Sequence, residues 1–134
     1  MDSNVIEGYL IRSGATYEPL GEGMWMVHDE FDNVDNIVVT LSPPMVLFRV
    51  KLMDLPEDPA THEPLFRKLL ELNTSAMVAG AYGIEAGAVV AMETLQAENL
   101  DLNEFQAALD GLTMAITEHY DDLKRFHTTA TAGR

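Results

Sequence analysis

Histidine, serine and cysteine side chains are the usual carriers of acid–base and nucleophilic chemistry, and in this sequence they are absent or widely spaced. There is no cysteine, which excludes disulfides, thiolate catalysis and cysteine-bound zinc or iron–sulfur clusters. The histidines form no HExxH motif and no pair at i, i+4, and the serines lie outside any GxSxG elbow. We therefore expect surface histidines and no enzyme activity; the residues concerned are His28, His62, His119, His127, Ser3, Ser13, Ser42 and Ser75.

Two places in the sequence could gather a cation. His119 lies among Glu118, Asp121 and Asp122 in a predicted helix, although ionised side chains on a solvated face are the simpler interpretation. The segment Asp29–Asn36 clusters the oxygen ligands that Ca²⁺ prefers, but it lacks the glycine and the glutamate that an EF-hand loop needs. We predict an acidic turn there. The glycines form no GxGxxG or Walker loop, so no metal or cofactor is predicted.

The net charge limits the kinds of partner. It is −14, from 22 acidic and 8 basic residues. The electrostatic field of this negative charge repels the phosphates of nucleic acids and anionic lipid headgroups, so nucleic-acid binding is not expected. A basic partner could be attracted, but a solvated acidic surface is the simpler interpretation. The most apolar stretch, Ala76–Met92, is rich in Ala and Gly and carries Glu85, which favours buried strands over membrane insertion. Met1–Leu10 does not resemble a secretory signal, and we expect a cytoplasmic location.

The elements that hold these residues begin with a short helix and a run of strands. The helix is predicted over Asn4–Arg12, with Gly14 just past its end, where a left-handed cap is typical. β-Branched and apolar runs then predict an antiparallel meander of three strands. These strands are Met24–Val27, Ile37–Leu41 and Met45–Leu52.

The next helix, about residues 63–76, carries more apolar surface than one sheet face needs. Its two apolar rows span roughly 160° of the helix, against the roughly 100° that covers one face. Either a second copy of the chain covers the extra row, or the helix packs on two sides within the monomer; both interpretations stay open. The first row is Leu65, Leu69, Leu72 and Ala76, and the second is Phe66, Leu70 and Met77.

The last part of the chain predicts a hairpin and the longest helix. Ala79–Ile84 and Ala88–Leu95 flank a short loop that contains Gly87, and the final helix opens at Asp101 with a capping box and ends near Phe126. The order is α-β-β-β-α-β-β-α, an α+β fold with an antiparallel sheet. We predict one domain over residues 1–127 and a flexible tail over residues 128–134.

Four stretches between Leu69 and Leu109 form a recognisable pattern: Leu69-Leu70-Glu71-Leu72-Asn73, Gly80-Ala81-Tyr82-Gly83-Ile84, Val89-Val90 and the run from Leu95 to Leu102. With these residues the segment resembles the YbjN-type branch of the type III secretion chaperone-like proteins, which have the fold of the Tir chaperone (CesT-like). The element order extends the likeness over nearly the whole chain.

This resemblance implies a homodimer without cofactor or catalytic centre. Its protein partners would bind as extended segments along strand edges and apolar patches, in a chaperone-like manner. A regulatory or sensory protein-interaction module without chaperone activity is the alternative. Trp25 is the candidate for an exposed anchor, with core packing as the other interpretation. The interface candidates are Leu65, Phe66, Leu69, Leu70, Leu72, Asn73 and Trp25.

Overall fold

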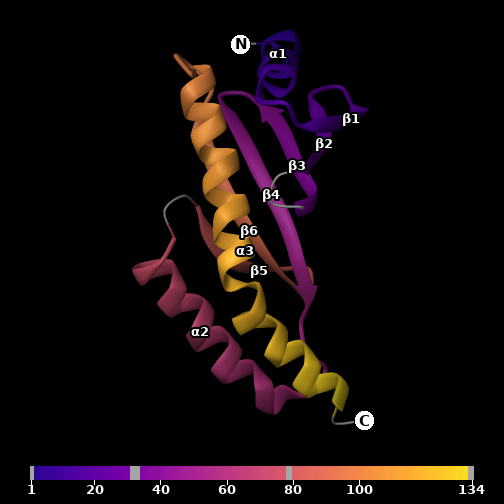
Figure 1. Cartoon of the computed structure of the whole chain (residues 1–134), viewed down its shortest axis with the longest axis vertical. Helices are drawn as coiled ribbons and strands as arrows, with labels where there is room; N and C mark the ends of the chain where they lie inside the picture. The colour runs from indigo at the N-terminus through magenta and orange to yellow at the C-terminus, as the bar shows by residue number, and fades with distance from the viewer. Residues whose placement is uncertain (1, 31–33, 78–79, 133–134) are drawn as a thin grey trace.

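A computed structural model describes residues 2–30, 34–77 and 80–132 of the chain (Figure 1). Within these ranges the chain forms long helices, one short 3₁₀ helix and a single antiparallel sheet. The elements in chain order are α1 (Ser3–Ser13), β1 (Thr16–Gly21), β2 (Met24–Asp29), β3 (Val34–Ser42), β4 (Met45–Asp54), η1 (Pro59–Thr61), α2 (His62–Ser75), β5 (Ala81–Glu85), β6 (Ala88–Gln96) and α3 (Leu102–Ala132). The α+β class predicted from the sequence is confirmed.

The sheet has six strands in the order β1-β2-β3-β4-β6-β5, and each neighbouring pair is antiparallel. Strand β1 was not predicted, so four strands and not three precede α2. It contains Pro19 and ends at Gly21, two residues that normally indicate a turn. Because β1 is an edge strand, Pro19 can lie in it without removing a hydrogen bond from the sheet interior. The two edges of the sheet are therefore β1 and β5.

One hydrophobic core joins the helices to one face of the sheet. Trp25, Val39 and Phe48 are cross-strand neighbours on this face, and all three side chains are buried. Phe105 of α3 packs on Phe48, with ring centroids 5.2 Å apart, and on Tyr9 of α1 at 5.4 Å. Figure 1 shows α3 running along the sheet with α2 beside it.

Two helix caps lie where the sequence predicted them. Gly14 caps α1 in the left-handed conformation, with φ of 78°. The amide of Glu104 donates to the Asp101 carboxylate at 2.8 Å and the amide of Asp101 donates to the Glu104 carboxylate at 3.3 Å, which confirms the capping box of α3. Helix α3 continues to Ala132, beyond the end near Phe126 that the sequence predicted.

Candidate functional site

The two apolar rows of α2 have different environments. In the first row Leu65, Leu69 and Leu72 are 0%, 4% and 6% exposed and belong to the core. In the second row Leu70 is 66% exposed, and Phe66 is only half-buried. The single chain thus buries the first row, whereas the second row, called the open row below, is exposed at Leu70 and only partly packed against the core at Phe66 and Met77.

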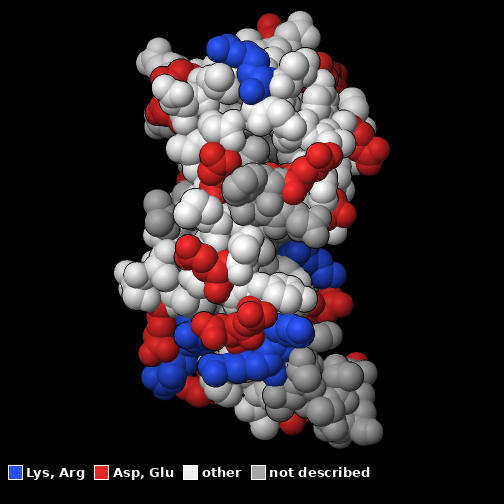
Figure 2. Space-filling model, in the orientation of Figure 1, with Lys and Arg blue, Asp and Glu red and all other residues white. Residues whose placement is uncertain are grey.

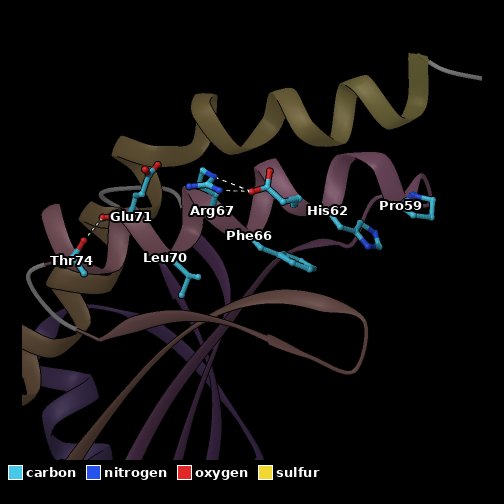
Figure 3. A pocket seen from close by; sticks show the side chains of 8 residues that line it. Pro59, His62, Phe66, Arg67, Leu70, Glu71 and Thr74 are labelled. Carbon is cyan, nitrogen blue, oxygen red and sulfur yellow. Dashed lines mark hydrogen bonds and ion pairs between the residues drawn. The ribbon is translucent and has the colours of Figure 1, made fainter.

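The open row lines a groove of about 740 Å³ along the outside of α2. Figure 3 shows Phe66 and Leu70 pointing to the same side of the helix, while Arg67 and Glu71 lie along another side. The groove therefore has an apolar floor and a charged rim, which is the usual composition of a protein contact. Its lining residues are Pro59, His62, Glu63, Phe66, Arg67, Leu70, Glu71 and Thr74.

Glu63 and Arg67, which lie one helical turn apart on the charged rim, form an ion pair. Arg67 donates to the Glu63 carboxylate from Nε at 2.9 Å and lies 2.8 Å from it through Nη2. The hydrogen bond and the charge of Glu63 both raise the pKa of Arg67 above its ordinary value. An exposed pair of this kind contributes little to stability.

The N-terminal end of the groove is fixed by short-range hydrogen bonds. The Asp58 carboxylate accepts from the Ala60 amide at 3.0 Å, and this starts η1. His62 lies with Nε2 2.7 Å from the carbonyl oxygen of Pro56, and its ring centroid is 5.4 Å from that of Phe66. The ring of His62 is thereby held against Phe66 as the wall of the groove.

At the other end of α2, Asn73 ties the helix to the edge strand β5. The amide of Tyr82 donates to Asn73 Oδ1 at 2.7 Å, and Asn73 Nδ2 donates to the Tyr82 carbonyl at 3.2 Å. Asn73 therefore positions α2 beside β5, and its polar groups are used within the chain. On β5, Ile84 is 45% exposed and pairs with the buried Val89 on the sheet face that α2 covers. The open row of α2 and the free edge of β5 thus lie next to each other.

Trp25 is not an exposed anchor. Its side chain is 1% exposed and lies in the core, and its Nε1 donates to the Glu7 carboxylate at 3.1 Å. A tryptophan on the covered face of a central strand buries a large apolar area, and Glu7 accepts its single polar hydrogen. The interpretation as core packing holds, and Trp25 is not retained among the surface residues.

His119 also lies elsewhere than expected, since it is 6% exposed and not a surface histidine. Its Nδ1 shares a hydrogen bond of 2.7 Å with the hydroxyl of Tyr82, so that α3 is joined to β5. Tyr82 and Asn73 together connect α2, β5 and α3 at the edge of the sheet.

Replacing Tyr82 by phenylalanine should lower the free energy of unfolding by about 1–2 kcal/mol at pH 7, because Nδ1 of His119 would lose its partner. Burial, assisted by the charge of Glu118, raises the pKa of Tyr82 above 10.0. The unfolded chain therefore loses this proton first, and the wild type loses stability as the pH rises above about 10. Urea denaturation at pH 7 and pH 10.5 should show a smaller alkaline loss in Tyr82→Phe than in the wild type. An equal loss in both proteins would contradict this role.

The other candidates of the sequence give no second site. Among the described residues, no three His, Asp or Glu side chains gather to hold a metal ion. Part of the acidic segment Asp29–Asn36, residues 31–33, lies outside the described residues. No helix in the described part of the chain is long and apolar enough to cross a bilayer. Figure 2 shows acidic side chains scattered over one face of the molecule, with Lys and Arg at its upper end and in its lower part.

The order of elements and the six-stranded antiparallel sheet, with the helices packed on one face, define an α+β fold. The family model CesT_Tir_1 matches residues 2–129, and the chain belongs to this family. None of the curated proteins is significantly similar to it in sequence.

Solved structures share this fold at low sequence identity. YbjN of E. coli, a candidate transcription regulator, has a TM-score of 0.63 at 16% identity, over 89% of this chain and 91% of that one. The Yersinia pestis type III secretion chaperone SycH, solved with a fragment of YscM2, gives 0.59 at 12% identity over 86% and 97%. The ExoU–SpcU complex of the Pseudomonas aeruginosa type III secretion system gives 0.55 at 19% identity over 90% and 96%.

Proposed function

We propose that this protein is a non-enzymatic homodimer that binds a segment of a partner protein. The observation that carries the proposal is the open row of α2, in which Leu70 is 66% exposed beside the free edge of β5. Exposed apolar side chains grouped in a groove mark protein contacts more often than single exposed leucines do. The net charge of −14 further favours a protein over nucleic acid as the partner. We place this action in the cytoplasm, in keeping with a cysteine-free sequence.

A second copy of the chain is the occupant that we assign to the groove of α2. In a twofold dimer the same patch meets itself, so Phe66 and Leu70 of both copies would face each other. A helix of 14 residues is about 21 Å long, and its outer face alone falls well short of the about 800 Å² per partner of a stable interface. The edge of β5, with Ile84, is the adjoining surface that can supply the remainder.

Gel filtration with light scattering tests the dimer directly. The chain has a mass of 14.8 kDa, so we expect a species of about twice that mass at micromolar concentration. A clean 14.8 kDa monomer under these conditions would remove the dimer from the proposal.

The partner segment is expected to bind in extended form, at a strand edge and on apolar patches. Support comes from the family and from the secretion chaperones of the same fold, one of which was solved with a fragment of another protein. The likeness to YbjN, a candidate transcription regulator, favours a second function, a regulatory module that binds a folded protein. Affinity capture followed by limited proteolysis separates the two, because a chaperone protects a short unfolded segment and a regulator protects a folded domain.

A further inference from the structure

Strand β5 is one edge of the sheet, and an edge strand presents peptide groups to which another strand can add. Along an antiparallel strand, residues that bond the neighbouring strand alternate with residues whose N–H and C=O groups point away from it. Glu85 and Ala88 pair at the ends of the short turn between β5 and β6, so they are a hydrogen-bonded pair. Gly83 then also faces β6, and the outward residues of β5 are Tyr82 and Ile84.

The carboxamide of Asn73 already occupies the outward peptide groups of Tyr82. The Tyr82 amide donates to Asn73 Oδ1 at 2.7 Å, and Asn73 Nδ2 donates to the Tyr82 carbonyl at 3.2 Å. A carboxamide carries an acceptor and a donor as a peptide does, so these two bonds are the ones that a residue of an added strand would make. Within β5, Ile84 is left to pair with another strand.

Asn73 is held in this position by the whole of α2. It lies in the last turn of the helix, and the row that contains Leu69 and Leu72 anchors the helix in the core. A strand that approached Tyr82 would therefore have to break both hydrogen bonds and displace the end of α2. The contact consequently closes the middle of β5 to strand addition.

The opposite edge, β1, is closed at one position by a different residue. The carbonyl of Gly23 accepts from the Leu41 amide of β3 at 2.7 Å, so by the same alternation the peptide groups of Trp25 also face β3. Pro19 lies opposite Trp25 and therefore directs its nitrogen away from the sheet. Because proline has no amide hydrogen, it offers no donor to an added strand. Each edge of the sheet thus has an outward position that cannot form a full pair of hydrogen bonds.

We propose that Asn73 blocks strand addition at β5, so that copies of the chain meet through side chains of α2 and β5 and do not join their sheets edge to edge. The inference rests on the proposed function in that the copies associate at α2, but the block acts on any strand that approaches β5. Without it, two β5 strands could pair with Tyr82 of each copy opposite Ile84 of the other. Asn73 is thus a positioning residue that limits association to one surface.

Self-association in a Leu70→Asp background tests the block, because the contact at α2 is expected to be lost there. Light scattering over a range of concentrations should give Leu70→Asp/Asn73→Ala a Kd at least about tenfold below that of Leu70→Asp. The matched control is Asn103→Ala in the same background, which removes an exposed asparagine from α3 and should leave the Kd unchanged. Asn73→Ser can replace only one of the two hydrogen bonds and should be intermediate, and it decides the comparison if Asn73→Ala does not fold.

Amide hydrogen exchange, followed by NMR, locates the contact. In dilute Leu70→Asp the Tyr82 amide should be protected at least about tenfold more than that of Ile84, and Asn73→Ala should remove this difference. When the double variant associates at high concentration, both amides should exchange more slowly.

Two results would overturn the inference: a folded Asn73 variant with the Kd of Leu70→Asp, or a Tyr82 amide that exchanges as fast as that of Ile84. In either case, a wild-type dimer that Leu70→Asp dissociates would still support the proposed function. A Leu70→Asp protein that remains dimeric would instead contradict the assignment of the dimer to α2, and the exchange of the Tyr82 amide would still decide whether Asn73 closes β5.

Discussion

Leu70→Asp is expected to yield a folded monomer, whereas Leu69→Asp is expected to unfold the protein. The two leucines are neighbours on α2, but Leu69 is 4% exposed and Leu70 is 66% exposed. A carboxylate at residue 69 would be buried without a partner and would leave a cavity as well, a combined cost of several kcal/mol against a total stability of about 5–15 kcal/mol. A carboxylate at residue 70 would be solvated in the monomer and would change its stability by about 0.5 kcal/mol or less.

At the proposed twofold interface the introduced carboxylates of the two copies would be brought close together and desolvated, so the Kd of the dimer should rise by a factor of about 100 or more. Light scattering gives the mass, and circular dichroism reports whether the fold persists. Leu70→Met keeps the apolar contact and is the matched control, for which a dimer is expected. A folded dimer of Leu70→Asp with the wild-type Kd would move the interface away from α2.

The extra apolar surface of α2 could be predicted from the sequence, but its division between core and surface could not. Periodicity showed two rows, and it does not say which row faces the sheet when both contain leucine. That choice depends on the end of the helix, where Asn73 binds both backbone groups of Tyr82 and fixes the rotation of α2. The interface candidates Leu65, Leu69 and Leu72 therefore lie in the core of the single chain, and Phe66 and Leu70 remain as surface candidates.

The features that the sequence did not predict depend on contacts between distant residues. Strand β1 contains Pro19, and only its place at the edge of the sheet makes that residue compatible with a strand. His119 stands between acidic residues and was expected on the surface, but the hydroxyl of Tyr82, 37 positions away in sequence, gives its ring a buried partner.

Gly80→Ala should destabilise the protein far more than Gly87→Ala, although both glycines have the same kind of backbone conformation. Their φ angles are 74° and 76°, so alanine is strained at either position by about 1–2 kcal/mol. A Cβ on Gly87 would meet nothing within 4 Å, whereas a Cβ on Gly80 would lie 2.1 Å from the carbonyl oxygen of Met92 and 3.1 Å from Cδ2 of Leu112. Since the first of these atoms belongs to the backbone of β6, β5 would have to move away from its neighbour.

We therefore expect Gly87→Ala to lower the free energy of unfolding by about 1–2 kcal/mol and Gly80→Ala by more than about 3 kcal/mol. Urea denaturation at one fixed protein concentration measures both, because the apparent stability of a dimer depends on concentration. Gly80 directly precedes β5, so a displaced β5 would also disturb the edge that we assign to the dimer, and the Gly80→Ala protein that remains folded should dissociate more readily. Equal losses in the two variants would show that backbone strain alone acts and that β6 does not approach Gly80 closely.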